Sequence, residues 1–278
     1  MQLTRHESGA SFGEAAETFL LKAEAENGLM LGLIGSLSER AETDETKPVL
    51  ATVAVAGHTV ACALRTPPFP IVVTRAPDEA LGSLAREFAE LDAGAPGVLG
   101  PREAALEFST HWSAATGRGH EVIMQQGIYS LEQVDLQIPD APGLFRPATP
   151  DDIDLISGWI AEFHTEASSG IKSDPRVAAE QGVEAASIFV WDDARPVALA
   201  GTAGPTRHGI RVNLVYTPPE MRGKGYASAL VGRLSQKLLT GGKDFCFLYT
   251  DLTNPTPNKI YQRLGYRLVC EGVGINFE

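Results

Sequence analysis

The sequence predicts a mixed α/β fold, an α+β sheet that is divided into two halves. Three observations support this prediction. Strand patterns alternate with helix patterns in the C-terminal half, which is typical of α/β layering. Three successive strand patterns in residues 187–216 indicate an antiparallel meander. A segment rich in proline and glycine, residues 137–144, reads as a linker, and we place the domain boundary between residues 141 and 142.

The composition is that of a soluble globular protein. The chain has 278 residues, of which 44% are hydrophobic and 21% charged. We find neither an apolar run long enough to span a bilayer nor the apolar core of a secretory signal, so we expect a cytoplasmic protein with no membrane partner. The three cysteines, Cys62, Cys246 and Cys270, fall in apolar strand patterns, which favours buried thiols in a reducing compartment.

The net charge of −12 is unevenly distributed. Residues 1–143 carry a net charge of −11, whereas residues 144–278 carry −1. A nucleic-acid-binding protein usually presents a basic face, and this chain offers none, so we expect no nucleic-acid partner. The nearly neutral C-terminal half can hold an anionic ligand without a strong opposing field.

The elements of the C-terminal half follow one another clearly. A short strand over residues 144–149 leads into a helix with Thr149 as N-cap and Pro150 at its first position. The three strands of the meander come next. The chain continues with a helix over 226–239 that two glycines end, a strand over 244–252, a helix over 256–264 and a closing strand over 266–278.

The N-terminal half contains short echoes of the C-terminal half. VACAL at residues 60–64 aligns with VALAG at 197–201, and GIYSL aligns with LGYRL at the same offset of 137 residues. Two short matches leave open whether the chain is a duplication or the matches are chance. If the halves are related, the N-terminal copy is degenerate, and we expect it to cover the acceptor side or to support contacts in a homodimer.

The segment VYTPPEMRGKGYASALV joins a strand to a helix through a basic, glycine-containing loop. The first amides of a helix have no partner within the helix, and the helix dipole adds positive charge there, so this arrangement suits a phosphate. An ordinary glycine-rich turn before a surface helix is the alternative. The spacing matches neither a P-loop nor a dinucleotide-binding fingerprint.

Two motifs resemble the signatures of the GNAT superfamily of N-acetyltransferases. Arg222, Gly225 and Ala227 match the pyrophosphate motif Gln/Arg-x-x-Gly-x-Gly/Ala. Residues 254–266 are similar to the second signature, which Asn254, Tyr261 and Gly265 match. The departures are Pro257 for Ala or Ser, Ile260 for Leu and Tyr266 for Phe. The resemblance covers residues 144–278 and extends to a bacterial group of acetyltransferases with an extra N-terminal half.

The resemblance implies acetyl-CoA as the donor substrate. The strand before the loop would splay from its neighbour and pair with the pantetheine arm, the loop would hold the pyrophosphate, and two asparagines would anchor the arm. The implied coenzyme-binding residues are Leu214, Val215, Tyr216, Arg222, Gly223, Lys224, Gly225, Tyr226, Ala227, Asn254 and Asn258.

The catalytic residues implied are an acid and a base. Tyr261 is the expected acid, which protonates the departing thiolate of coenzyme A. The base that receives the proton of the amine is open, because the strand at 210–216 offers Arg211 and Asn213 but no carboxylate. The candidate bases therefore lie elsewhere: Glu162, His164, Glu166 and Asp251, each of which also reads as an ordinary solvated residue. The candidate lining of the acceptor pocket is Trp159, Phe163, Trp191 and Tyr249.

The function expected from the sequence is transfer of an acetyl group to a primary amine of a small molecule or an amino-acid-like acceptor, in a ternary complex. The alternative is a coenzyme A-binding module that senses acyl-CoA and catalyses nothing. A third reading keeps the fold and uses a longer acyl chain. The histidines, cysteines and acids show no metal-ligand spacing, so we expect no metal.

Overall fold

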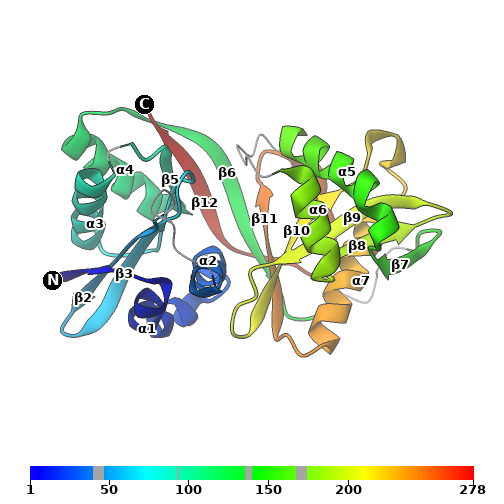
Figure 1. Ribbon diagram of the computed structural model, residues 1–278, viewed down its shortest axis with the longest axis horizontal. Helices are drawn as coiled ribbons and strands as arrows, with labels where there is room; N and C mark the ends of the chain where they lie inside the picture. Colours follow the sequence, from blue (N-terminus) through cyan, green and yellow to red (C-terminus); the bar gives the residue numbers. More distant parts are fainter. Residues whose placement is uncertain (40–46, 93, 135–139, 167–173) are drawn as a thin grey trace.

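The computed structural model describes the chain except for residues 40–46, 93, 135–139 and 167–173. Within the described part, strands from both halves form a single 12-stranded sheet in the order β1-β2-β3-β4-β5-β12-β6-β11-β10-β9-β8-β7. Helices lie on both faces of this sheet, and the two halves form two lobes joined at its centre (Figure 1). The predicted linker, residues 137–144, lies partly outside the described residues.

Both halves repeat one order of elements. The N-terminal half comprises β1 (Gln2–His6), α1 (Gly9–Leu20), α2 (Gly28–Glu39), β2 (Val49–Val55), β3 (His58–Arg65), β4 (Ile71–Val73), α3 (Asp78–Leu91), β5 (Gly97–Pro101), α4 (Arg102–Thr116) and β6 (His120–Leu131). The C-terminal half comprises β7 (Leu144–Pro147), α5 (Ile153–Glu166), α6 (Pro175–Glu184), β8 (Ile188–Asp192), β9 (Pro196–Ala203), β10 (Gly209–Tyr216), α7 (Tyr226–Thr240), β11 (Phe245–Asp251), α8 (Pro255–Arg263) and β12 (Arg267–Phe277). This correspondence supports the two-part arrangement, and the meander is confirmed as antiparallel β8-β9-β10.

The last strand of each half pairs with the other half. β12 runs antiparallel to β5, with Val273 opposite Gly100, and β6 runs antiparallel to β11, with Tyr129 opposite Leu248. β6 and β12 also pair with each other at the centre of the sheet. The two halves therefore share one continuous set of backbone hydrogen bonds.

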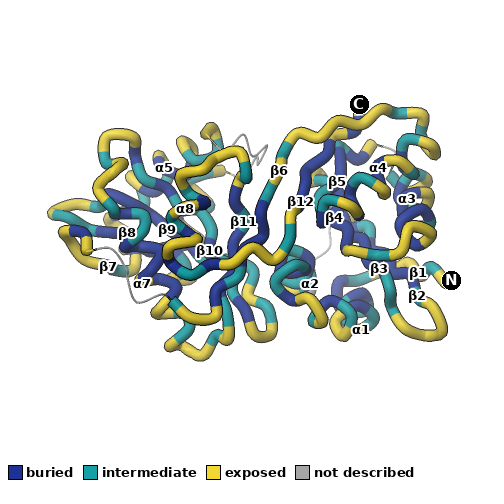
Figure 2. The backbone as a smooth tube through the Cα atoms, turned by 180° about the vertical axis from the view of Figure 1, so that it is seen from behind, coloured by how far each residue is buried: buried dark blue, intermediate teal, exposed yellow. Residues whose placement is uncertain are grey.

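Four groups of buried side chains hold the helices to the sheet. In the N-terminal half, α3 and α4 cover one core and α1 and α2 another. In the C-terminal half, α7 packs on a core that includes Tyr261, whereas α5 and α6 pack on a core that includes Tyr216. Figure 2 shows most connecting loops exposed, whereas the strands β8 and β9 are largely buried. None of the described helices is long and apolar enough to cross a membrane.

Contacts between the halves also fix the start of β10. The buried carboxylate of Glu24 accepts hydrogen bonds from Thr206 Oγ1 at 2.6 Å, from His208 N at 2.7 Å and from Gly209 N at 3.2 Å. The first residue of α2, Gly28, leaves no room for a Cβ atom against the ring of Phe247. Because these contacts come from the N-terminal half, that half positions the strand on which the site below is built.

Replacing Phe247 with alanine should lower the free energy of unfolding by about 3–5 kcal/mol, the usual cost of deleting a fully buried aromatic side chain. Phe247 is 0% exposed and lies where α2 meets β11. Denaturant unfolding measures the change. The control Phe69→Ala removes a ring that is 43% exposed, and it should change stability much less. A loss below about 1 kcal/mol for Phe247→Ala would contradict the packing of α2 on β11.

Two sequence expectations need correction. The sequence analysis assigned no helix to residues 175–184, but α6 forms there, with the Asp174 side chain accepting hydrogen bonds from Arg176 N and Val177 N. The expectation of three buried thiols holds for Cys62 and Cys246, whereas Cys270 is only half-buried because it lies on a less covered stretch of β12.

Candidate functional site

β10 and β11 separate to form a wedge in the C-terminal half. The two strands pair in parallel only from Gly209–Arg211 to Phe245–Phe247, although β10 continues to Tyr216 and β11 to Asp251. β10 has a β-bulge at Leu214, whose φ is 49°. Between the pairs Asn213–Gly201 and Tyr216–Leu199, β10 therefore contains one residue more than β9. Leu214 and Val215 therefore fall outside the regular ladder, which leaves their backbone groups available to an added extended ligand.

The helix after the wedge begins without a side-chain cap. Gly225 is the N-cap of α7 with φ 85°, and Gly223 has φ 78°, a region that only glycine enters easily. Within the described part of the chain, the N–H groups of residues 223–225 have no hydrogen-bond partner, and the first helical bond runs from Ala229 N to Gly225 O. The first turn, which starts at Tyr226 and Ala227, contains no acidic residue. Free amides at the start of a helix are an arrangement that suits an anion.

The two cations of the loop have different surroundings. Arg222 donates to both oxygens of Glu166, at 2.7 and 2.8 Å, and to Thr217 O at 2.9 Å. The hydrogen bond that Arg222 donates to Glu166 raises the pKa of Arg222. Lys224 is exposed, and its Nζ lies 3.7 Å from Met221 Sδ. Arg222 therefore shapes the loop, while the ammonium of Lys224 has no acidic partner among the described residues.

The asparagines of α8 occupy the opposite side of the wedge opening. Asn254 caps α8 and accepts from Thr256 N at 3.3 Å. Asn258 is buried, and its Nδ2 donates to Asp251 O at 3.0 Å, which ties α8 to the end of β11. The Oδ1 atom of Asn258 is buried without a hydrogen-bond partner.

Tyr261 lies in the core beneath α7. Its side chain is 7% exposed and its ring packs edge-on against Tyr266, with 5.9 Å between ring centroids. Burial raises the pKa of Tyr261, so its hydroxyl stays protonated at neutral pH. No described side chain forms a hydrogen bond with this hydroxyl. Tyr266, by contrast, lies within hydrogen-bonding distance of Ser235 Oγ at 2.8 Å.

The predicted bases lie on different sides of α5. Glu162 accepts a hydrogen bond from the hydroxyl of Tyr216 at 2.7 Å, and Glu166 binds Arg222 one turn later. His164 lies between them in sequence and therefore projects from another side of the helix. Burial lowers the pKa of His164, and its ring lies beside Phe163. The structure brings Glu162 to the end of β10 but does not bring His164 to Glu162.

The remaining predicted residues divide between core and site. Trp159 packs in the core under α5 and α6, and Trp191 packs on the α7 side, where its Nε1 donates to Pro142 O. Asp251 accepts from Thr253 N and Oγ1 at the end of β11. Tyr249 lies on the side of β11 that faces α2, and its hydroxyl accepts from Leu29 N at 3.1 Å.

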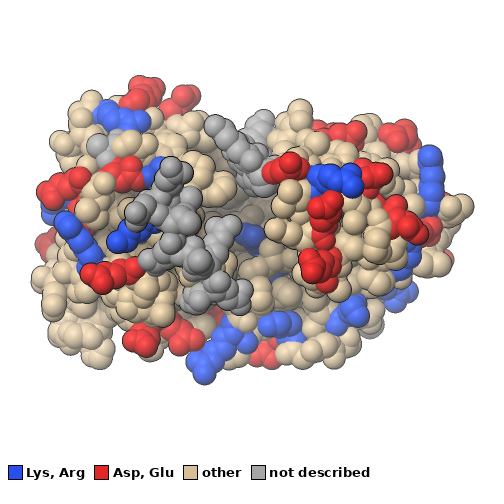
Figure 3. Space-filling model, viewed as in Figure 1, with Lys and Arg blue, Asp and Glu red and all other residues tan. Residues whose placement is uncertain are grey.

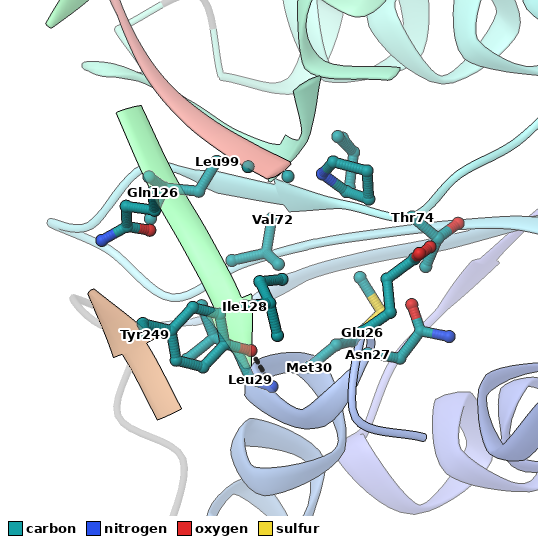
Figure 4. A pocket seen from close by; sticks show the side chains of 14 residues that line it. Glu26, Asn27, Leu29, Met30, Val72, Thr74, Leu99, Gln126, Ile128 and Tyr249 are labelled. Atoms are coloured by element: carbon teal, nitrogen blue, oxygen red, sulfur yellow. Dashed lines mark hydrogen bonds between the residues drawn. The ribbon is translucent and has the colours of Figure 1, made fainter. Parts of the chain in front are cut away.

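The described residues of the N-terminal half show no counterpart of the glycine N-cap that begins α7. The helix that corresponds to α7 is α3, which begins after Pro77 with Asp78 and Glu79 in its first turn. Two carboxylates at this position repel a phosphate. Between β4, β5 and α2 lies a cavity of about 40 Å³, which Figure 4 shows with Tyr249 and Leu29 at one end. This volume is far below that of a ligand pocket for coenzyme A.

Two buried polar atoms near the tip of the wedge were not singled out as binding groups in the sequence analysis. Arg211 Nε and Asn213 Oδ1 are enclosed and lack hydrogen-bond partners. Both residues are on β10, and Arg211 is in the last pair before the strands diverge. The alternation of side chains along IRVNLVY could have indicated them, because polar residues alternate there with apolar ones.

Comparisons with known proteins agree with this geometry. Residues 200–273 match the family model described as FR47-like protein. A Drosophila protein of solved structure superposes with a TM-score of 0.70 at 13% identity, covering 99% of this chain and 98% of that chain. A GNAT-family acetyltransferase from Colwellia psychrerythraea gives 0.58 at 11% identity, covering 100% and 99%. A search of curated proteins found no match.

A tandem GNAT protein from the clavulanic acid biosynthesis pathway also superposes, with a TM-score of 0.55 at 13% identity, covering 100% of this chain and 98% of that chain. The fold is therefore the GNAT fold. Both halves have this fold, and the FR47-like segment lies in the C-terminal half, in agreement with the resemblance found in the sequence.

Proposed function

We propose that this protein transfers an acetyl group from acetyl-CoA to a primary amine of a small molecule or an amino-acid-like acceptor. The observation that carries the proposal is the uncapped, glycine-led start of α7 at the open end of the wedge, with Tyr261 in the core beneath it. The C-terminal domain, residues 142–278, would bind the coenzyme, and the N-terminal domain, residues 1–141, would support β10 and cover the acceptor side.

The pyrophosphate of coenzyme A would bind the amides of residues 223–227 and the ammonium of Lys224. The pantetheine arm would then extend along Leu214, Val215 and Tyr216, with Asn258 Oδ1 and Asn254 on its other side. This places the thioester toward the tip of the wedge, where the two strands meet.

The reaction would proceed by direct attack of the neutral amine nitrogen on the thioester carbonyl carbon. The C–N bond forms, the C–S bond breaks, and the thiolate takes the proton of the Tyr261 hydroxyl. The amine proton would reach Glu162 through ordered water, because this carboxylate lies at the end of β10 and not at the tip of the wedge. His164 is the second candidate base, and its lowered pKa favours the neutral imidazole that can accept a proton.

Turnover separates this proposal from a sensor that only binds acyl-CoA. The protein is incubated with acetyl-CoA and a panel of primary amines, and free thiol is followed over time. Thiol release that depends on an amine supports the transferase. Calorimetric binding of coenzyme A without thiol release from any amine would favour the sensor.

Turnover should not decrease as the pH rises to 10. Burial raises the pKa of Tyr261 above its ordinary value of 10.0, so the hydroxyl keeps its proton as the pH rises through that value. We therefore expect kcat to stay level up to pH 10 once the base and the amine are deprotonated. A decline with a midpoint below pH 10 that is absent from Tyr261→Phe would contradict the acid role.

A further inference from the structure

Arg211, at the tip of the wedge, is an arginine that burial largely desolvates and that has no acidic partner among the described residues. Its Nε is enclosed and makes no hydrogen bond, and no ion pair joins Arg211 to any described carboxylate. Among the described residues, its guanidinium interacts with the ring of Tyr249, whose centroid lies 6.0 Å from Cζ. Desolvation lowers the pKa of Arg211, although arginine stays charged in proteins. A buried cation without an anion is costly, so its presence indicates a ligand.

The position of Arg211 determines which ligand this is. Arg211 and Asn213 lie on the side of β10 that faces away from α7, since the intervening Val212 packs into the α7 core. On their own side, Tyr249 connects β11 to Leu29 of α2. Figure 3 shows the molecular surface hollowed between the two lobes. The side chain therefore borders the space between the halves.

The pyrophosphate of the coenzyme is not this anion. Its proposed site begins at Gly223, beyond the end of β10 at Tyr216, whereas Arg211 is five residues back along the strand. An extended strand advances roughly 3.3 Å per residue, so about 16 Å separate Arg211 from Tyr216. The anion at Arg211 is therefore at the end of the wedge where the thioester would lie, on the acceptor side.

We propose that Arg211 binds a carboxylate of the acceptor, and that the protein acylates amines that carry a carboxylate, such as amino acids. The guanidinium presents a planar pair of N–H donors that fits a carboxylate in bidentate geometry. This inference rests on the proposed transferase function and adds the class of acceptor.

The first test compares matched acceptors with acetyl-CoA: glycine with methylamine, L-alanine with ethylamine, and L-phenylalanine with phenethylamine. Thiol release is expected from at least one amino acid, with kcat/KM roughly 10- to 150-fold above its matched amine, the value of a hydrogen bond to a charged group. Equal rates within every pair would overturn the carboxylate site and leave the transferase intact. No thiol release from any amine would contradict the transferase itself.

The second test uses Arg211→Met and Arg211→Lys, with Arg233→Met as a control that removes an exposed arginine of α7. Arg211→Met should remove the preference for the amino acid and raise its KM, while the calorimetric affinity for coenzyme A changes less than about 3-fold. Arg211→Lys keeps the charge but loses the bidentate geometry, and should recover part of the preference. Arg233→Met should match the unchanged protein. An undiminished preference in Arg211→Met would overturn the proposal.

Thermal unfolding supplies a readout without turnover. Because Arg211 is a buried cation without an anion, Arg211→Met should raise the Tm of the ligand-free protein. A lower Tm would show that Arg211 has a structural role, and it would overturn the assignment to a ligand.

A carboxylate on the acyl chain is the competing source of the anion. This alternative is tested with methylamine as the acceptor. If succinyl-CoA turns over faster than acetyl-CoA, and Arg211→Met removes this difference in rate, the carboxylate belongs to the donor and the proposal is contradicted.

Discussion

Replacing Gly225 with glutamate should abolish the binding of coenzyme A. Gly225 has φ 85° at the start of α7, and a side chain there would stand at the head of the helix, where a Cβ atom meets only Ala141, at 4.0 Å. A carboxylate at that point repels the pyrophosphate and cancels the positive end of the helix dipole. Like charges in contact cost several kcal/mol, so we expect the dissociation constant to rise at least roughly 100-fold in calorimetry.

The control for this variant is Gly242→Glu at the other end of the same helix. Gly242 also has a positive φ, 99°, and open space around the position of a Cβ atom. It therefore bears a comparable backbone strain and the same added charge, without proximity to the proposed pyrophosphate. Coenzyme binding should be nearly unchanged in Gly242→Glu. An unaltered affinity in Gly225→Glu would exclude the loop from the binding site.

Replacing Tyr261 with phenylalanine should lower kcat by roughly 10²- to 10⁴-fold, the usual contribution of a general acid, and leave the affinity for coenzyme A within about 2-fold. The hydroxyl has no partner among the described side chains, so its removal should cost little stability. Release of free thiol from acetyl-CoA in the presence of an accepted amine gives the rate.

Tyr266→Phe provides the matched comparison for this variant. Tyr266 is also buried, but its hydroxyl is paired with Ser235 Oγ. We expect Tyr266→Phe to lose about 0.5–1.5 kcal/mol of stability and to retain most of its turnover. If Tyr261→Phe keeps full activity, another group must protonate the thiolate. Equal losses of activity in both variants would indicate that the effect is one of packing.

The local elements of the C-terminal half were predictable because each has a local signal. Gly225 and Gly241 flank α7, and β11 reads as a continuous apolar strand. Helix α6 was missed although Asp174 and Pro175 form an N-cap and a first helical position, because its sequence is too polar to show an apolar stripe. The loop and the motif tyrosine were found because glycine spacing and a family resemblance marked them.

The pairing of strands between the halves was not predictable. β6 and β12 each read as a strand, but nothing in a strand pattern specifies its neighbour when several apolar edges are available. That Arg211 has no acidic partner among the described residues was likewise not predictable from the sequence, because this also depends on which strands are neighbours. Its surroundings come from Tyr249 on another strand, and the α2 contact at that tyrosine comes from the other half of the chain.

The reciprocal strands also constrain how the protein is made. Gly100 of β5 completes its ladder only with Val273 of β12, so the sheet of the first half stays open while the second half is still being synthesised. An unfinished edge of this kind can associate with other chains, and contacts between such distant residues form slowly. The protein is thus most exposed to aggregation while the N-terminal half has been synthesised and the C-terminal half has not. Its native sheet forms only when both lobes assemble together.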